Sequence, residues 1–343
     1  MVLDEGGAFL TEADLVRLVE GKSVFYTATT YTDYLRVQQE IRLVRKYASQ
    51  VTVVTYDHSS YVLRLLGLYF YLLFHRLSKY DVVFVGFAPQ LILPFWRFKF
   101  RDVSVISDFF ISFYDTLVND RKKFGAHSIV AKLLFWLDCR TVKQSDFIIA
   151  DTKTHAEYFH KTFLAGRQRT CVVYLEADPR YYYPRQNAKP KYLQDKFVVL
   201  YFGSVIPLQG VDVVVRAAEL TADLEAVHFV LIGPLSSAQK EVLNRNNNVT
   251  HLDWVTQHEL ADWISFSDLC LAGHFNDEID KAKNTIPGKA YIYEAMGKLI
   301  VLGDNPANRE RYPKRYEKVR FVQMGSAEAL NKIITEESGY SDE

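Results

Sequence analysis

Short runs of β-branched and aromatic residues recur along the first half of the chain, with longer amphipathic segments between them. The runs predict strands at residues 23–29, 51–55, 81–85, 102–106, 146–150 and 171–175. The segments with helical spacing predict helices at 33–47, 61–78, 128–143 and 154–163. Strands that alternate with helices favour a parallel sheet with helical crossovers. The first half is therefore predicted to be a doubly wound α/β domain.

The pattern stops between Asp178 and Asp195, where three of the ten prolines lie among tyrosines and charged residues. Such a stretch is typical of an inter-domain connection. Beyond it, strands are predicted at 196–202, 227–232, 249–252, 269–272 and 319–322, and helices at 211–221, 237–245 and 257–265. We expect an N-terminal domain at 1–180, a linker at 181–195 and a C-terminal domain at 196–343, with a cleft between the two domains.

Composition and charge narrow the class of protein. At 343 residues, with 49% hydrophobic and 24% charged residues, the chain is predicted to be globular and to form two domains. Lys plus Arg equal Asp plus Glu at 41 each, so no overall field attracts a polyanion, and nucleic acid is not expected as a partner. The cysteines Cys139, Cys171 and Cys270 have no paired spacing, which favours small core residues in a reducing compartment.

Two segments leave a membrane contact open. The N-terminus is acidic and polar, unlike a secretory signal, so we expect a cytoplasmic protein. The longest apolar run, 65–74, has about ten residues, whereas a membrane span needs about 20. However, residues 65–76 and 92–101 combine aromatic with basic side chains, as interfacial surfaces do. They predict either a buried helix with a snorkelling loop or peripheral contact with the inner face of the cell membrane.

The stretch from Lys281 to Glu310 is the strongest candidate for a binding site. It contains a polar loop, a predicted helix at 288–296, a break at Gly297 and an apolar strand. A helix that begins below a basic loop directs its free N–H groups and its dipole at that loop, and both favour an anion. Lys281, Lys283 and Lys289 add charge that can neutralise a phosphate. The turn at 202–210 is a second candidate phosphate loop, or else a plain connection.

These motifs, in this order, resemble the nucleotide-sugar domain of glycosyltransferase family 4, retaining enzymes of the GT-B fold. The resemblance rests on Gly203 and Gly210, LIGP at 231–234, DWVTQHELADWISFSD at 253–268, and KAKNTIPGK, EAMGK and GDNPANRE between 281 and 310. In the first half, 107–123 and 145–163 are similar to bacterial members from capsule and lipopolysaccharide clusters. The fold that this implies is α/β GT-B, with two doubly wound Rossmann-like domains facing a cleft.

The resemblance implies transfer of a sugar, with retention, from a nucleoside diphosphate to a hydroxyl of a lipid-linked glycan. It also implies that no metal or cofactor takes part and that the donor is a UDP sugar rather than a GDP sugar. The carboxylates of the NDEID segment, Asp277, Glu278 and Asp280, are interpreted as a solvated loop beside lysines and not as metal ligands. The donor-binding residues implied are Gly203, Ser204, Gln209, Gly210, Gly233, Asp253, Trp254, Lys281, Pro287 and Glu294.

The chain departs from the family at its donor loop. Family members place an Arg and a Lys where this chain has Ser204 and Gln209, so more of the charge on the diphosphate falls to Lys289. The family's pair of glutamates is also incomplete, because Ile286 or Ile292 occupies one of the two positions, according to the alignment chosen. Glu294 is the remaining candidate for the nucleotide ribose.

Further candidates follow predicted strands in both halves. Asp108 and Asp115, after the strand at 102–106, are predicted either to orient or deprotonate an acceptor hydroxyl or to cap turns. His127 is a cap or a sugar ligand, and His274 follows a strand at its carboxyl end. We therefore predict Asp108, Lys289 and His274 as catalytic residues. Arg36, Asp115 and His127 are predicted on the acceptor side.

Two other functions remain open. The missing cations at Ser204 and Gln209 and the incomplete glutamate pair favour a catalytically impaired scaffold that supports another transferase. The other possible function is that of a sugar-nucleotide epimerase on the same fold.

Overall fold

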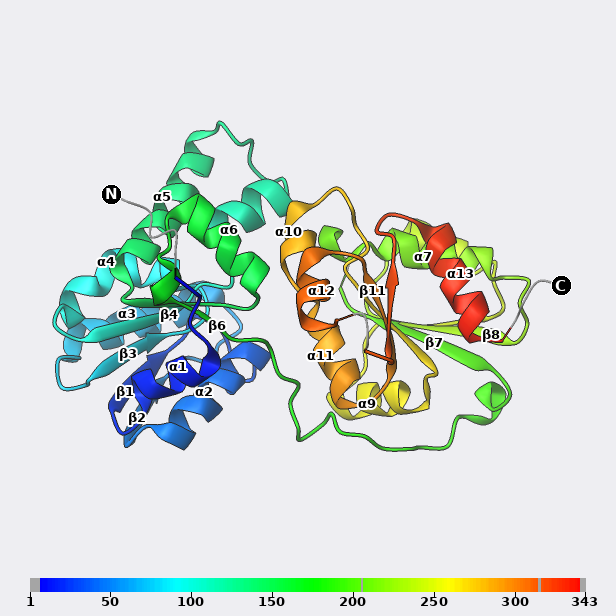
Figure 1. Cartoon of the computed structure of the whole chain (residues 1–343), viewed down its shortest axis with the longest axis horizontal. Coiled ribbons are helices and arrows are strands. Elements are labelled where there is room, and N and C mark those ends of the chain that lie inside the picture. The colour runs from blue at the N-terminus through cyan, green and yellow to red at the C-terminus, as the bar shows by residue number, and fades with distance from the viewer. Residues whose placement is uncertain (1–6, 205, 314–315, 340–343) are drawn as a thin grey trace. The chain divides into compact units, whose positions relative to one another are not determined.

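The computed structural model describes residues 7–339 except 205, 314 and 315 (Figure 1). The chain forms two units that divide after Glu176. Each unit contains one six-stranded parallel sheet with helices packed on it, so both predicted α/β units are confirmed.

The N-terminal unit has strand order β2-β1-β3-β4-β5-β6. The strands are β1 (Ser23–Thr27), β2 (Gln50–Val54), β3 (Val82–Val85), β4 (Ser104–Asp108), β5 (Phe147–Ala150) and β6 (Thr170–Val172). The helices are α1 (Glu12–Val19), α2 (Leu35–Tyr47), α3 (Tyr61–Phe74), α4 (Leu93–Trp96), α5 (Ile129–Gln144) and α6 (Lys153–Phe163). Shorter helical turns lie at η1 (Pro89–Leu91), η2 (Arg97–Phe100), η3 (Asp115–Asp120) and η4 (Arg167–Arg169).

Alternate residues of these strands face different helices. Val24 and Tyr26 of β1 pack with Val37 and Ile41 of α2 in a core that α1 also joins. Phe25, between them, faces a second core that contains residues of α3 and α4. The same alternation in β5 places α5 and α6 on the face that carries α3 and α4. One face of the sheet is therefore covered by α1 and α2, and the other by α3 to α6.

The C-terminal unit has strand order β12-β11-β10-β7-β8-β9. The strands are β7 (Phe197–Phe202), β8 (Val227–Ile232), β9 (Val249–Leu252), β10 (Leu269–Gly273), β11 (Leu299–Gly303) and β12 (Val319–Val322). The helices are α7 (Val211–Leu220), α8 (Ser237–Leu243), α9 (Gln257–Phe266), α10 (Asp280–Asn284), α11 (Gly288–Ala295), α12 (Pro306–Arg311) and α13 (Ala327–Glu337). Turns η5 (Lys191–Leu193) and η6 (Pro207–Gln209) complete it. Helices α7 and α13 share one core, and α11 contacts β10 and β11.

The segment predicted as a linker is attached to the C-terminal unit. Asn187 donates a hydrogen bond to Asp262 at the surface of α9, and Lys189 pairs with Asp268 before β10. Tyr182 is buried, and its hydroxyl contacts Gln257.

Two predictions about the N-terminal unit need correction. Asp108 is the last residue of β4 and does not lie on a loop after it, because the strand begins and ends two residues later than predicted. His127 does not open the long helix, since α5 begins at Ile129 and Ser128 is its N-cap. Across the described residues, no helix combines the length and the apolar character that crossing a membrane requires.

Candidate functional site

The order in which the chain adds strands to the C-terminal sheet reverses at β7. The chain proceeds from β7 to β8 and β9 on one side and then returns to β10 on the other side. In doubly wound sheets, ligands bind at the carboxyl ends of the strands that flank such a switch point. A cavity of about 460 Å³ lies there, lined by Ile206 and Pro207 after β7, by the first turn of α7, and by residues 275–278 after β10. The two loops that line it therefore form the candidate ligand-binding site.

Glycines bring the backbone close together at this edge. Gly203 follows β7 with φ +152°, and Gly233 follows β8 with φ +130°. A Cβ on Gly233 would lie 2.0 Å from the carbonyl oxygen of Gly203. A Cβ on Gly203 would lie 2.6 Å from Gln209 Oε1 and 3.0 Å from Lys289 Nζ. Gly233 therefore requires glycine because a side chain would collide with backbone, and the positive φ of Gly203 favours glycine at that position as well.

Lys289 is the cation at this site. It lies in the first turn of α11, whose N-cap is Pro287, and is only 6% exposed. Its Nζ donates a hydrogen bond to Gln209 Oε1 at 2.7 Å and lies 4.4 Å from the ring centroid of Tyr201. Burial lowers the pKa of Lys289 to about 7. The amine is thus held by a neutral amide and an aromatic face, and a bound anion would restore its charge.

Gln209 links the two loops. Its side-chain oxygen accepts from Lys289 and also from the hydroxyl of Tyr201, at 2.7 Å in each case. Gly210 then forms the N-cap of α7, so the free N–H groups of that helix point toward the cavity. Sequence reasoning placed Gln209 and Lys289 in one site but did not foresee their direct contact, which spans 80 positions.

Several predicted donor residues lie around this centre. His274 follows β10 and is buried, next to Phe275 in the wall of the cavity. Ser204 follows Gly203 and is exposed. Lys281 is half-buried in α10, and Lys283 in the same helix pairs with Asp280 at 2.8 Å. Helix α10 packs against η6 and therefore lies beside Gln209.

Other predicted donor residues are engaged elsewhere. Asp253 and Trp254 follow β9, the edge strand two strands from β7, and Trp254 is largely exposed. Asp253 forms a surface ion pair with Lys240 at 2.7 Å. Glu294, near the end of α11, accepts from Arg311 Nη2 at 2.9 and 3.1 Å. It also accepts from the hydroxyls of Tyr312 and Tyr316, at 3.0 Å each, and these contacts tie α11 to the segment after β11.

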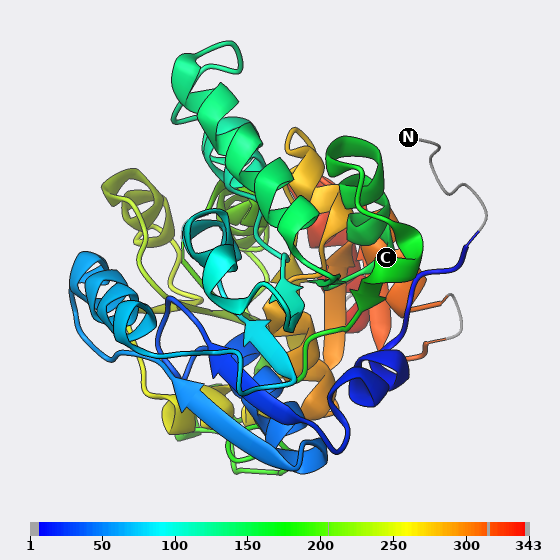
Figure 2. The same ribbon diagram turned by 90° about the vertical axis from the view of Figure 1, so that its left-hand side faces the viewer.

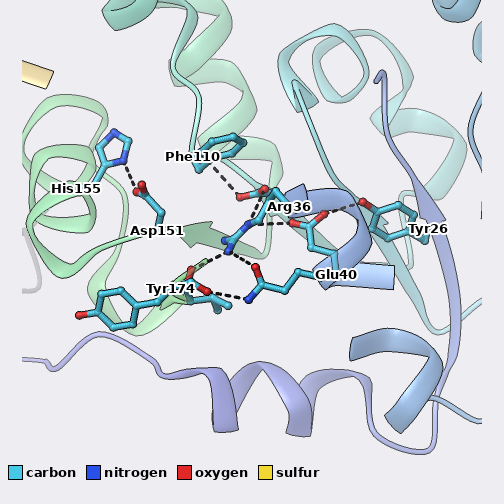
Figure 3. Close-up of polar contacts among 10 residues, drawn as sticks. Tyr26, Arg36, Glu40, Phe110, Asp151, His155 and Tyr174 are labelled. Carbon is cyan, nitrogen blue, oxygen red and sulfur yellow. Dashed lines mark hydrogen bonds and ion pairs between the residues drawn. The ribbon is translucent and has the colours of Figure 1, made fainter. Parts of the chain in front are cut away.

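A buried charge cluster contains Arg36, which was predicted on the acceptor side (Figure 3), and Asp108, which was predicted as a catalytic residue. Arg36 Nε lies 3.1 Å from Asp108 Oδ2 and 3.5 Å from Glu40 Oε1, and Nη1 donates to the carbonyl of Val173 at 2.8 Å. Glu40 Oε2 accepts from the hydroxyl of Tyr26 at 2.7 Å. Because Asp108 is only 1% exposed, its carboxylate serves the ion pair and does not meet solvent.

The electrostatics of the cluster follow from burial. Desolvation, and then the charge of Asp108, raise the pKa of Glu40 well above its usual range, against the influence of Arg36. Burial also acts to raise the pKa of Asp151. His155, whose Nδ1 lies 2.6 Å from Asp151 Oδ1, together with Arg36 and a backbone hydrogen bond, outweighs burial, and the pKa is lowered. Glu40 follows Arg36 by four residues on α2, a helical spacing from which the pair could have been found.

The other two acceptor-side predictions lie outside this cluster. Asp115 is buried at the start of η3 and accepts from Asn119 Nδ2 at 3.1 Å. His127 is exposed ahead of α5. The structure therefore does not bring Arg36, Asp115 and His127 together in one pocket of the N-terminal unit.

Comparisons with known proteins agree with this architecture. Residues 196–336 match the family model described as "Glycosyl transferases group 1". Comparison with curated protein sequences gives no match. Among solved structures, sucrose-phosphate synthase from Thermosynechococcus elongatus is similar with TM-score 0.65 and 12% identity, over 93% of this chain and 91% of that one.

Two further structures are similar over nearly their whole length. Anabaena Alr3699/HepE in complex with UDP has TM-score 0.61 and 14% identity, covering 92% of this chain and 89% of that chain. The structure titled trehalose-6-phosphate from E. coli, bound with UDP-2-fluoro glucose, has TM-score 0.61 and 10% identity, covering 93% and 92%. At such low identity these likenesses show the fold alone, which is the GT-B fold with two Rossmann-like domains.

Proposed function

We propose that this protein is a retaining glycosyltransferase of the family 4 type. It moves a sugar from a nucleoside-diphosphate sugar, UDP-linked rather than GDP-linked, to a hydroxyl of a lipid-linked glycan in the synthesis of a cell-surface polysaccharide. The support is the family match of the C-terminal unit, the GT-B fold, and the residues at its switch point.

The observation that carries the proposal is the buried amine of Lys289. A lysine that is 6% exposed and bonded to an amide is costly to keep charged, and burial lowers its pKa accordingly. A diphosphate beside Nζ would offset that cost. The N-termini of α7 and α11 flank the same edge and would add partial positive charge. The site thus fits an anionic leaving group better than a neutral ligand.

These residues have a direct role in transfer. As the bond between sugar and diphosphate breaks, negative charge develops on the leaving oxygen. Lys289 and the helix N–H groups are fixed before reaction, so they stabilise that charge without reorganising. We propose that no metal is needed because the lysine and the helix dipoles perform this task. His274, buried beside the same cavity, is the residue we propose faces the transferred sugar.

The acceptor side rests on different evidence. A lipid-linked acceptor would place the enzyme at the inner face of the cell membrane, in contact through residues 65–76 and 92–101. Exposed Phe70, Leu73 and Phe74 in the first segment, and Phe95 and Phe98 in the second, support that contact.

Thermal denaturation with and without nucleotides tests the donor site. UDP, GDP, CMP and dTDP and their sugar conjugates are compared, each with and without Mg²⁺. A ligand at 100 times its dissociation constant adds about 2.7 kcal/mol to the free energy of unfolding, which is readily measured. We expect a shift from UDP and its sugars that is independent of metal and is lost in Lys289→Met. Lys332→Met, which removes an exposed lysine from α13, is the control and should keep the shift.

A second function is favoured by one observation. Gln209, at a position where the family carries a cation, already occupies the amine of Lys289, and Glu294 is tied to Arg311. A protein that scaffolds another transferase could hold its loop closed in this way. Absence of any nucleotide shift would support that function and exclude the transfer reaction. Conversion of the donor sugar without an acceptor would instead indicate an epimerase.

A further inference from the structure

The outward face of α3 is unusual for a helix at a protein surface. Its exposed side chains are all apolar, with exposed fractions from 50% to 67%: Val62, Leu63, Leu66, Phe70, Leu73 and Phe74. The opposite face, with Leu68 and Leu72, is buried in the core. Arg64, the one charged residue of the helix, is buried and stacks on Tyr31. A helix that is apolar on its outer face requires a partner other than water.

Helix α5 has a second outward stripe. Ile129 is 86% exposed, and Leu133 and Trp136 follow at helical spacings of four and three residues. Ala131, Leu134 and Leu137 form the opposite, buried face. The basic residues Lys132, Arg140 and Lys143 are exposed as well, so the helix presents apolar and positive side chains to solvent. This surface lies outside residues 65–76 and 92–101, and the sequence pattern alone did not identify it.

Helices α3 and α5 belong to one continuous surface. Both cover the same face of the sheet, with α4 and η2 between them. The ring of Tyr69 in α3 lies 5.2 Å from that of Trp96 in α4, and Lys99 donates to the carbonyl of Leu73 at 3.0 Å. Arg97 donates to the carbonyl of Gln144 at the end of α5 at 3.1 Å. Figure 2 shows the three helices side by side in blue, cyan and green.

The exposed charges of this surface are mostly positive, and the exposed acidic residues of the segment 61–144 are Asp81 and Asp102. Residues 61–144 contain twelve Lys or Arg, six Asp and no Glu, although the whole chain is neutral. Four of the six aspartates are buried: Asp108, Asp115, Asp120 and Asp138. A loop before α5 adds Arg121, Lys122, Lys123 and Phe124, all exposed. Apolar side chains surrounded by exposed basic ones complement a bilayer with anionic headgroups, and they do not complement a second copy of the same positive surface.

We propose that α3, α4 with η2, α5 and the loop 121–124 form one surface that binds an anionic lipid bilayer. The apolar side chains of α3 and α5 enter the interface between headgroups and acyl chains, and the basic side chains contact lipid phosphates. This inference goes beyond the proposed transfer reaction, because binding to lipid needs neither the donor nor Lys289. It also enlarges the membrane contact beyond the two segments expected from the sequence.

Co-sedimentation of the full chain with vesicles tests the proposal, without any nucleotide present. Vesicles of phosphatidylcholine alone are compared with vesicles that also contain phosphatidylglycerol. We expect binding to the mixed vesicles and weak binding to the neutral ones. Three variants divide the surface: Leu66→Ser with Phe70→Ser in α3, Leu133→Ser with Trp136→Ser in α5, and Lys122→Glu with Lys123→Glu in the loop.

Each variant has an expected size of effect. Each apolar pair should weaken binding by about tenfold or more, from the methylene groups that no longer enter the interface. Reversal of the two loop charges should weaken binding by at least about thirtyfold, since loss of each basic residue near an anionic surface costs about fivefold and each new glutamate adds repulsion. The matched control is Arg45→Glu with Lys46→Glu on α2, on the opposite face of the sheet, which should bind as the unmodified protein does.

Two results would overturn the inference. If the α5 variant and the loop variant bind vesicles as well as the unmodified protein does, α5 and the loop 121–124 are not part of the lipid-binding surface. This comparison requires that all variants keep the same melting temperature. A concentration-dependent dimer in sedimentation velocity, lost in the α3 variant and without vesicle binding, would show that a second copy covers the face instead. Neither result bears on nucleotide binding, so the lipid surface and the donor site fail independently.

Discussion

Replacement of Lys289 by methionine removes the buried amine at the switch point and keeps a side chain of similar length. The oxygen of Gln209 does not lose its last partner, because the hydroxyl of Tyr201 still donates to it. The variant should therefore fold. It separates two effects of the lysine, namely the cost of burying it and its contribution to anion binding.

The cost of burial follows from the pKa. Burial lowers the pKa of Lys289 from 10.5 to about 7, which corresponds to roughly 5 kcal/mol at 1.36 kcal/mol per pKa unit. Below about pH 7 the amine is protonated in the folded and unfolded states, so the folded state bears the full cost. Between about 7 and 10.5 the unfolded state binds more protons, and the free energy of unfolding rises with pH. Lys289→Met should thus be more stable than the unmodified protein near pH 6, by an amount that shrinks toward pH 10.

Urea unfolding at about pH 6 and about pH 9.5 measures this difference. Lys332→Met, which loses an exposed lysine, should show the same small change at both pH values. A Lys289→Met variant whose stability relative to the unmodified protein is independent of pH would contradict the burial argument. So would a variant that is less stable than the unmodified protein at about pH 6.

The same lysine links nucleotide binding to proton uptake. At pH 8 an amine with a pKa of about 7 is mostly neutral, and a diphosphate beside it would raise that pKa again. Binding should therefore take up close to one proton. Calorimetry in buffers of different ionisation enthalpy detects this uptake, and Lys289→Met should abolish it. The variant should also lose roughly 2–4 kcal/mol of transition-state stabilisation in sugar transfer, as for loss of one oxyanion donor.

Three further changes have defined outcomes. Gly233→Ala should lower the free energy of unfolding by about 3 kcal/mol or more, because its Cβ would collide with the carbonyl oxygen of Gly203. A melting curve measures the loss, and the control is Gly125→Ala, where a Cβ meets no atom within 4 Å. Arg36→Met should cost about 3–5 kcal/mol of stability because it leaves the buried carboxylate of Asp108 unpaired. The urea midpoint measures the loss, and a midpoint equal to that of the unmodified protein would contradict the ion-pair account. Glu294→Gln should cost about 1–3 kcal/mol of stability because it weakens the hydrogen bonds to Arg311, and it should keep the nucleotide-induced shift in melting temperature. Loss of that shift would instead assign Glu294 to nucleotide binding.

The alternation of strands and helices was largely readable from the sequence. The strands at 227–232, 249–252 and 319–322 were predicted with their observed bounds, because each is a β-branched or apolar run between turn residues. Helices α1 and α13 were not predicted. They are short, and their apolar faces are completed only by packing on α2 and α7.

The sequence identified candidate residues for the site but did not predict the contacts among them. Lys289 and Gln209 were both predicted, and their placement at one switch point depends on the strand order, which local patterns do not specify. Asp108 was predicted on a loop after a strand, either as a carboxylate that orients or deprotonates the acceptor hydroxyl or as a turn cap. Its burial depends on Arg36, 72 positions away, which compensates the charge. Long-range pairing of this kind leaves little trace in a single sequence.

The buried cluster around Arg36 constrains how this chain can evolve. Loss of the arginine alone leaves Asp108 without a cation and removes the guanidinium that lies beside Glu40, and loss of Asp108 alone leaves the arginine short of an anion, so each single step is disfavoured. Joint replacement of the group by apolar residues of similar volume would be close to neutral in stability. Homologues should therefore keep these three positions together or exchange them together, and intermediates that hold only one or two of them should be rare.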